Sequence, residues 1–514
     1  MADYLAGVDV GTTGARCMIF DLQGNPVAGH YCDYGADYPQ PGWVEQQPDL
    51  LIAKTMDACR AAIEQSGIDP NRIASIGFSA QRSVACPIDA DGKPVRPMFS
   101  WQDARTADEV EELRRIISDD QYYAESGLPL GTTWIITKLL WMRNHEPELL
   151  DKTARFVQNQ DLVLKAFGAD DFYTDLCCAV FYGVWDIRRA DWNHSLLERL
   201  ELTPGMFGRP TTPGTQVGTI SPAVAERTGF APGTPLCLGA GDQNCSVLGM
   251  GAVEPGIATV TLGTAGLAIL TTEKPQAGFG GMMITHHVAP GMWEVEGLSN
   301  AAAASLRWFR DTIATHEKHI ESNGGPDAYQ QLDELAASAP AGSQGLLYLP
   351  YLATAATPRW NPNARASFVG LSFAHGRAEM TRAVMEGVVL EIRDMFEQWT
   401  TAGLDVRSLR IGGGATKSNL WNQIQADIYG RPVETLRVSE STGLGAALLA
   451  GLGAGIFSSI KEGVNAMVHV ADRIEPNPQR HQQYEELYHA YVQSYEGLTN
   501  SGAFDSLARI QAIR

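Results

Sequence analysis

Two short segments rich in glycine and threonine have residue types that can bind phosphate. Residues 11–14 (GTTG) follow the apolar run 5–10, and residues 263–266 (GTAG) follow the apolar run 257–262. A tight turn that contains glycine presents consecutive backbone N–H groups, and threonine hydroxyls add further donors, so the turn can bind an anion without a lysine. Either segment alone fits an ordinary β-turn. Two such turns facing each other would hold a polyphosphate chain between them.

Two aspartates stand at strand ends where they could act on such a phosphate. Asp9 ends the first apolar run, where its carboxylate could hold a phosphate-bound Mg²⁺ through water. The corresponding residue in the second segment is Thr261, so only one turn carries the acid. Asp242 follows the strand 236–241 and begins a helix. It could be a helix N-cap, or a general base that takes a proton from a substrate hydroxyl during phosphoryl transfer.

Two common nucleotide motifs do not fit the sequence. No GxGxxG follows a first strand with an acidic residue further on, which argues against a dinucleotide fold. Residues 412–417 (GGGATK) lack the P-loop spacing, because the lysine comes too early. We interpret this stretch as a glycine-rich turn from a strand to a helix, along which an adenosine could lie.

The elements around these residues suggest two halves built on one plan. Residues 8–14 align with residues 260–266 at four of seven positions, and each segment predicts a strand–turn–strand hairpin. Chance similarity is the alternative for so short a window. Strands interspersed with helices in both halves predict an α/β fold. We expect an N-terminal domain over 1–249 and a C-terminal domain over 250–470, followed by a helical tail over 471–514 that packs back on the body.

Apolar spacing predicts the main helices of the second half. Residues 379–396 and 419–429 have helical spacing, and the strand 409–411 precedes the glycine-rich turn. Near the C-terminus, a predicted helix carries one stripe of large side chains, which is typical of a docking face. The stripe consists of Tyr484, Leu487, Tyr488, Tyr491 and Tyr495.

Composition limits the class of protein. The chain has 514 residues and a formal net charge of −20, which argues against nucleic acid or an anionic membrane as a partner. The eight cysteines lack paired spacing, so we expect reduced thiols. Asp3 stands where a signal peptide needs positive charge, and the apolar stretch 443–457 is too short and glycine-rich for a membrane span. We expect a soluble, cytoplasmic protein.

The motifs together resemble the FGGY family of carbohydrate kinases, which belong to the actin-like ATPase fold, and the resemblance covers essentially the whole chain. The first motif is 7–16, and the second is 239–243 with the later turn at 263–264. The third, and the most specific, runs from 366 to 386. The resemblance implies two actin-like (ribonuclease H-like) domains with an interdomain cleft. It also implies ATP and Mg²⁺ as cofactors, and a small sugar or polyol as the other substrate.

The resemblance implies a role for each matching residue. The catalytic base would be Asp242, and the metal would be held by Asp9 and Asp242. Nucleotide phosphates and adenosine would be contacted by Thr12, Thr13, Arg16, Thr264, Gly414 and Ser418. The sugar hydroxyls would meet Arg82, Ser83, Trp101, Asp242 and Gln243, with Arg82 donating as a fork and Trp101 covering carbon faces.

Departures from the family pattern affect mainly the substrate. Arg82 and Ser83 stand where xylulokinases have Met-His and glycerol kinases have Arg-Glu, although the rest of the chain resembles the xylulokinase branch. We expect a ketopentose such as D-xylulose as the substrate. Glycerol or another polyol, an aldonate, and an autoinducer-2-type dione are alternatives. Two other classes stay open, namely an actin-fold ATPase switch and a non-catalytic sugar-binding regulator. A homodimer also stays open.

Overall fold

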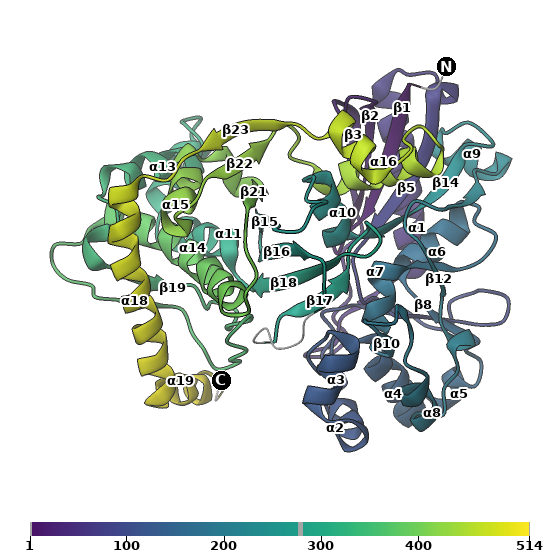
Figure 1. Cartoon of the computed structure of the whole chain (residues 1–514), viewed down its shortest axis with the longest axis horizontal. Coiled ribbons are helices and arrows are strands. Elements are labelled where there is room, and N and C mark those ends of the chain that lie inside the picture. Colours follow the sequence, from purple (N-terminus) through teal and green to yellow (C-terminus); the bar gives the residue numbers. More distant parts are fainter. Residues whose placement is uncertain (1–2, 276–280, 513–514) are drawn as a thin grey trace.

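Two β-sheets form the cores of the two halves of the molecule (Figure 1). The computed structural model describes residues 3–275 and 281–512. The first sheet has the order β13 (Gln216–Thr219), β14 (Pro235–Gly241), β5 (Ile73–Ala80), β1 (Tyr4–Val10), β2 (Gly14–Asp21) and β3 (Pro26–Asp33). The second has the order β17 (Met283–His286), β18 (Trp293–Ser299), β16 (Gly266–Thr272), β15 (Ile257–Leu262), β21 (Ser408–Gly412), β22 (Val433–Leu436) and β23 (Val470–Ile474).

The two sheets repeat one topology. In the first, β1 pairs antiparallel with β2 and parallel with β5, β2 pairs antiparallel with β3, and β5 pairs parallel with β14. In the second, β15 pairs antiparallel with β16 and parallel with β21, β16 pairs antiparallel with β18, and β21 pairs parallel with β22. The five-strand order and the directions agree strand by strand. This confirms the α/β class and the internal repeat predicted from residues 8–14 and 260–266.

Helices and short strands complete both halves. The longer helices are α1 (Pro48–Ser66), α2 (Ala107–Ile116), α3 (Asp119–Ser126), α4 (Ile135–His145), α6 (Asn159–Phe167), α10 (Asp242–Gly249), α11 (Ala302–Thr312), α12 (Thr315–Ser322), α13 (Ala328–Ser338), α14 (Arg377–Thr401), α15 (Asn419–Tyr429), α16 (Ser441–Gly453), α17 (Ile460–Met467), α18 (Pro478–Asn500) and α19 (Ala503–Ala512). The short helices are α5 (Pro147–Leu150), α7 (Leu176–Ala179), α8 (His194–Arg199) and α9 (Pro222–Thr228). The short strands are β4 (Glu45–Gln46), β6 (Cys86–Ile88), β7 (Met98–Phe99), β8 (Arg155–Val157), β9 (Tyr173–Asp175), β10 (Trp185–Asp186), β11 (Asp191–Trp192), β12 (Arg209–Thr211), β19 (Leu347–Leu349) and β20 (Ser367–Val369).

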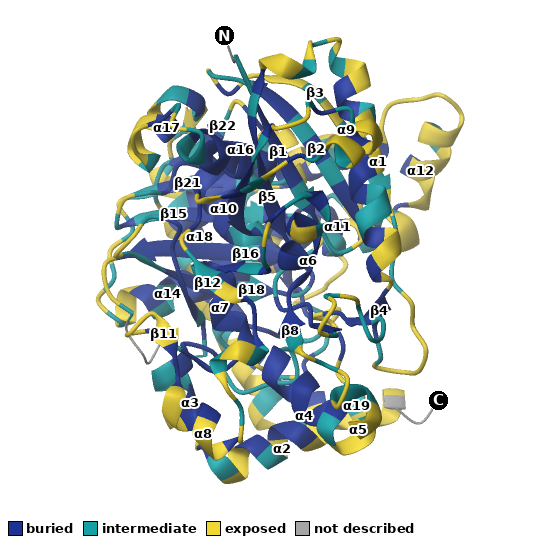
Figure 2. Ribbon diagram, turned by 90° about the vertical axis from the view of Figure 1, so that its right-hand side faces the viewer, coloured by how far each residue is buried: buried dark blue, intermediate teal, exposed yellow. Residues whose placement is uncertain are grey.

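Helix α16 lies between β22 and β23 of the second sheet in sequence but packs on the first sheet. It contacts α10, β1, β5 and β14, and Figure 1 shows it, in yellow-green, beside β1 and β5. Glycines allow this close approach: a Cβ on Gly7 of β1 would lie 1.9 Å from the carbonyl oxygen of Gly443, and one on Gly77 of β5 would lie 2.0 Å from that of Ala446. In the burial view, α10, α16 and β1 lie in the dark-blue interior, whereas α12 at the rim is largely exposed (Figure 2).

Most of the apolar stretch 443–457, which the sequence shows to be too short for a membrane span, forms α16. Its apolar side chains pack within the protein instead of facing outward on all sides. Across residues 3–275 and 281–512, no helix combines the length and the hydropathy that a membrane crossing requires.

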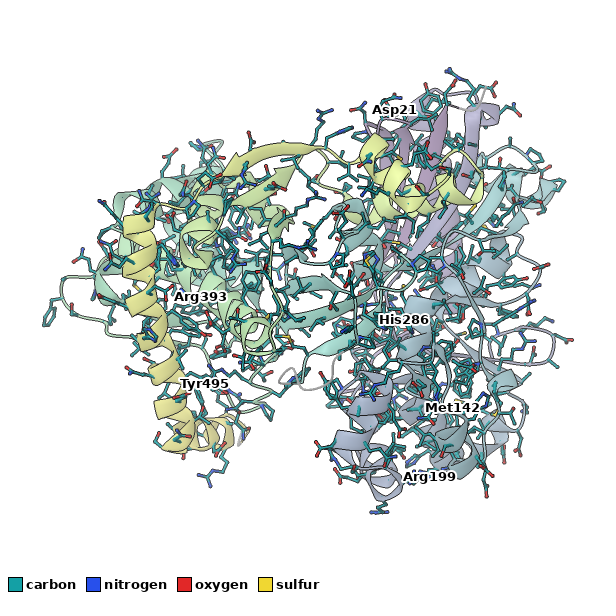
Figure 3. The ribbon with its side chains drawn as sticks, in the orientation of Figure 1. Asp21, Met142, Arg199, His286, Arg393 and Tyr495 are labelled. Carbon is teal, nitrogen blue, oxygen red and sulfur yellow. The ribbon has the colours of Figure 1, made fainter. Side chains whose placement is uncertain are left out.

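Helix α18 lies along the second half, and its aromatic stripe faces the body. Tyr484, Leu487, Tyr488, Tyr491 and Tyr495 are all buried, as the spacing predicts. The phenols also make polar contacts with α14. Tyr484 Oη donates to Glu386 Oε1 at 2.6 Å, and Tyr488 Oη donates to Asp394 Oδ1 at 2.9 Å. The stripe is therefore a docking face with hydrogen-bonding ends, and Figure 3 labels Tyr495 on it.

The close contact between α10 and α16 leads to a stability prediction. A Cβ on Gly445 would lie 1.9 Å from the carbonyl oxygen of Cys245, so Gly445→Ala should lower the free energy of unfolding by about 2–3 kcal/mol. Gly497 is the matched control, because it lies exposed in α18 and a methyl group added there would meet no neighbouring atom within 4 Å. Gly497→Ala should leave stability equal or raise it by up to about 1 kcal/mol. Urea unfolding measures both, and equal effects of the two substitutions would contradict the packing argument.

Candidate active site

The first glycine–threonine turn joins β1 to β2 and is held by two distant side chains. Gly11 N donates to Gly14 O at 3.0 Å, which closes the turn. Gln46 Nε2 donates to the Thr12 carbonyl at 2.7 Å, and Trp101 Nε1 donates to the Thr12 hydroxyl at 3.1 Å. Trp101 was predicted to cover the sugar. In the structure its indole N–H contacts the phosphate turn, so this side chain links the predicted sugar and phosphate regions.

Two further predicted phosphate ligands extend from the same hairpin. The Thr13 hydroxyl lies 3.0 Å from the Tyr31 hydroxyl. Arg16, on β2 directly opposite Asp9 on β1, forms an ion pair with Glu440 at the start of α16. Arg16 and Glu440 are both more than a third exposed, so this pair contributes little to stability. The Arg16 guanidinium is therefore available to exchange Glu440 for an anionic ligand.

The second glycine–threonine turn joins β15 to β16 in the same manner. Gly263 N donates to Ala265 O at 3.0 Å, and the carbonyl oxygens of Gly263 and Thr264 accept from the first N–H groups of α11. Thr264 is exposed. Both segments therefore form the strand–turn–strand hairpins that the sequence predicts.

The glycine-rich stretch after β21 lies against the second turn. Gly413 adopts a φ of +84°, and its Cα approaches the carbonyl oxygen of Leu262 so closely that a Cβ would lie at 2.6 Å. Gly414 is exposed and has open space around it. Ser418, the second residue predicted to border adenosine, caps α15 by accepting the Trp421 N–H at 3.0 Å. Ser418 is buried, so its hydroxyl has a structural role here.

The two aspartates named from the sequence lie near each other across the first sheet. Asp9 ends β1, and Asp242 begins α10 directly after β14. Burial, with the negative charge of Asp242 as the second cause, raises the pKa of Asp9 to about 7. Burial is also the main cause that raises the pKa of Asp242, while Arg82 acts to lower it. A cluster of acids with raised pKa values is typical of a site that binds a cation or moves a proton.

The residues present fit a magnesium ion that arrives with a nucleotide. Oδ1 of Asp9 is buried and has no hydrogen-bond partner among the residues that the structure describes. In that same part of the chain, no three His, Cys, Asp or Glu side chains are placed to hold a metal ion by themselves. Mg²⁺ commonly uses one or two carboxylates together with water and substrate phosphates, so the unpartnered Oδ1 of Asp9 matches its needs.

Asp242 is oriented by two neighbours. Its Oδ1 accepts the backbone N–H of Gln243 at 2.8 Å and lies 3.5 Å from Arg82 Nε, while about a quarter of the side chain is exposed. The aspartate is thus held in place by one oxygen and remains partly accessible. This arrangement is suited to accepting a proton from a bound hydroxyl. The N-cap alternative does not apply, since the helix N-cap is Gly241.

Both terminal nitrogens of the Arg82 guanidinium already donate to a protein side chain. Its Nη1 and Nη2 donate to Oε1 and Oε2 of Glu296, at 2.6 and 2.8 Å. Glu296 lies on β18 in the other half and is fully buried. Thr285 Oγ1 on β17 also donates to Glu296, at 2.9 Å. The guanidinium therefore bridges Glu296 and Asp242, and the donation of its fork to a substrate stays a prediction.

Ser83 and Gln243, the remaining predicted substrate ligands, flank this bridge. The Ser83 hydroxyl donates to the Thr133 carbonyl at 2.7 Å, and Ser83 has a φ of +61° and is buried. Gln243 is half-buried. The structure thus brings Arg82, Ser83, Gln243 and Asp242 to one place, although the polar groups of Ser83 and Arg82 already have partners.

Several hydrogen-bond partners of residues in and around the site were not predicted from the sequence. Glu296 and Glu294 alternate in an apolar strand, and two buried acids in such a strand were a signal for partners across the molecule. Asn244 Nδ2 donates to Glu294 Oε2 at 2.8 Å, while burial raises the pKa of Glu294 well above its usual value. Trp185 Nε1 donates to His286 Nε2 at 3.0 Å, and Figure 3 labels His286 where the halves meet. No sequence pattern near either residue predicts that contact.

Comparison with known proteins identifies the chain's relatives. A family model described as the N-terminal domain of the FGGY family of carbohydrate kinases matches residues 4–249, and its C-terminal counterpart matches residues 258–454. A gluconokinase of Bacillus subtilis (strain 168) is 28% identical over 96% of this chain and 95% of its own length. An autoinducer-2 kinase of Escherichia coli O139:H28 is 30% identical over 98% and 97%. The crystal structure of a xylulose kinase from Rhodospirillum rubrum has a TM-score of 0.87 at 26% identity, covering 97% and 99%.

The unpartnered Asp9 predicts a trade of stability against site chemistry. An acid whose pKa is raised by folding makes the folded state less stable as pH rises from its unfolded pKa, 3.8 for Asp9, to its folded pKa of about 7, because ionisation is easier in the unfolded chain. Asp9→Asn should therefore stabilise the protein in EDTA, and by about 2 kcal/mol more at about pH 8 than at about pH 5.

Thermal and urea unfolding at the two pH values measure this difference. Asp33→Asn, at the exposed end of β3, is the control and should change stability little at either pH. A stabilisation by Asp9→Asn that is the same at both pH values would contradict the burial of an ionisable Asp9.

Proposed function

Because the chain belongs to the FGGY family of carbohydrate kinases, and is therefore a phosphotransferase that uses ATP, we propose that it phosphorylates a terminal hydroxyl of a small linear sugar. The preferred acceptor in this proposal is a ketopentose such as D-xylulose. The observation that carries the proposal is the placement of Asp242 at the start of α10, where it is partly accessible, held by Gln243 and Arg82, and close to the buried Asp9.

Asp242 is the general base in this proposal. As the terminal hydroxyl of the acceptor attacks, its proton moves to the Asp242 carboxylate, a new O–P bond forms to the γ-phosphorus, and the bond to the β-phosphate oxygen breaks to leave ADP. The raised pKa of Asp242 makes it a better proton acceptor than an exposed aspartate. The Gln243 N–H keeps one carboxylate oxygen in place during the transfer.

The two turns hold the phosphates in this proposal. Backbone N–H groups and the hydroxyls of Thr12, Thr13 and Thr264 donate to them, and Arg16 leaves Glu440 to bind the same chain. Mg²⁺, held by Asp9 with Asp242 nearby, would neutralise charge on the β- and γ-phosphates. The adenosine lies along Gly414, whose surroundings are open.

Support for the acceptor comes from relatives and from the site. The solved relative from Rhodospirillum rubrum is named a xylulose kinase, whereas the two curated relatives are named gluconokinase and autoinducer-2 kinase. Trp101 contacts Thr12 at the phosphate turn and is about a third exposed, so its ring is free to cover carbon atoms of a short chain. We place the reaction in the cytoplasm, in agreement with the eight unpaired cysteines.

A coupled assay of ADP release tests the proposal across ketoses, polyols and aldonates. The proposal predicts acceptor-dependent ADP release, with D-xylulose among the best acceptors. ATP turnover that no acceptor stimulates would favour an actin-fold switch, and tight sugar binding without ADP release would favour a regulator.

The assignment of Asp242 as the general base predicts a loss of kcat when this residue is replaced. Asp242→Asn keeps the size of the side chain but removes the proton acceptor, so kcat should fall by at least about 100-fold. The Kd for ATP, measured by calorimetry, should stay within about twofold of the original value. A variant that retains more than a tenth of its kcat would contradict the role of Asp242.

The proposed role of the second glycine–threonine turn predicts that a substitution of Thr264 changes the KM for ATP and not the KM for the sugar. Thr264→Ala removes one hydroxyl donor, so the KM for ATP should rise by about 3–10-fold, the loss expected for one hydrogen bond. Thr264→Ser keeps the hydroxyl and should restore the original KM. A change confined to the KM for the sugar would contradict the assignment of Thr264 to the nucleotide subsite.

A further inference from the structure

Three cations near the predicted acceptor residues, Arg82, Lys138 and Arg105, are each paired with an acid. Arg82 lies beside Asp242, and both of its terminal nitrogens donate to Glu296. Its Nε lies 3.5 Å from Asp242, so the guanidinium faces two carboxylates. A guanidinium can form two parallel hydrogen bonds to one carboxylate. Arg82 already forms both with Glu296, so its two terminal nitrogens are not available in this way to a second anion.

Lys138 and Arg105 lie beneath the acceptor residues and are occupied in the same way. Lys138 is fully buried, its Nζ donates to the Thr132 carbonyl at 2.7 Å, and it lies 3.6 Å from Asp103. Arg105 Nη2 lies 2.7 Å from Asp103 and 2.8 Å from Glu45. These groups support the segment next to Ser83 and offer no unpaired charge to a ligand.

The charges around Asp242 therefore sum to a negative value. Asp242 and Glu296 carry two negative charges when ionised, and Arg82 carries one positive charge. A ligand that brings a carboxylate would add like charge to a partly buried site, which is unfavourable. A ligand that has only hydroxyl and carbonyl groups can donate to Asp242 and accept from Gln243 without adding charge.

We infer that the acceptor is an uncharged ketose or polyol, and that Glu296 excludes aldonates by keeping the Arg82 fork occupied. This inference rests on the proposed function and narrows its substrate class. Glu296 is a positioning residue in this account, because it acts through Arg82. Thr285 donates to the same carboxylate and helps to fix Glu296 in position. The two hydrogen bonds from Arg82 to Glu296 would have to be broken or shared before Arg82 could bind a carboxylate of the ligand.

The experiment compares neutral acceptors with aldonates of the same carbon chain. Xylitol is compared with D-xylonate and D-glucitol with D-gluconate, with D-xylulose as a further neutral acceptor, by ADP release with the full-length enzyme. We expect kcat/KM for the best neutral acceptor to exceed that of its aldonate by at least about tenfold. An aldonate that equals or exceeds its neutral counterpart would overturn the inference while leaving the kinase activity established. No ADP release with any acceptor would instead refute the proposed function, and the inference with it.

Substitutions at the bridge test the cause of the selectivity. Glu296→Gln frees the Arg82 fork and should shift the ratio of aldonate to neutral kcat/KM toward the aldonate by at least about fivefold. The double variant Arg82→Gln/Glu296→Gln removes the fork as well and should show no such shift. Glu294→Gln, on the same strand, is the matched control and should keep the original ratio.

A purely structural role of Glu296 would lower both kcat/KM values equally, and that result would overturn the inference. If Glu296→Gln does not fold, as judged by circular dichroism, the comparison of acceptors with the unmodified enzyme still decides it.

Discussion

The buried contact between Arg82 and Glu296 is the interaction on which the site depends. It joins the loop after β5 in the first half to β18 in the second, with both terminal nitrogens of the guanidinium engaged. Because Arg82 also faces Asp242, the position of the proposed base is set by a strand of the other half. Breaking such a pair leaves an uncompensated buried charge, which costs about 3–5 kcal/mol. The two halves therefore meet beside the proposed base.

The structure explains how an acidic chain can bind a polyphosphate. In the proposed function, backbone N–H groups at the two turns and threonine hydroxyls would bind the phosphates in place of a basic surface. The glycine content has a second cause besides these turns. Gly7 and Gly77 allow α16 to lie against the first sheet at backbone distance, so some of the chain's 52 glycines serve packing. The net charge of −20 argues against anionic polymers but not against one nucleotide bound between the turns.

Local patterns were sufficient for much of the fold. The seven-residue repeat predicted two hairpins in equivalent positions, and the tyrosine spacing predicted the buried face of α18, because turn chemistry and periodicity are local properties. The partners of Arg82 and Trp101 were not predictable in this way. Glu296 lies 214 residues beyond Arg82, and Thr12 lies 89 residues before Trp101, so both contacts depend on the completed fold. The limits of the domains and the roles of the site residues stay predictions.

Phosphorus NMR of a complete reaction mixture tests the central claim most directly, because it observes where the γ-phosphoryl group goes. The account predicts that ATP and an uncharged linear sugar give ADP and a sugar phosphomonoester in equal amounts, with the ester on a terminal carbon. Formation of inorganic phosphate and ADP without a phosphomonoester, in the presence of every ketose and polyol supplied, would contradict it.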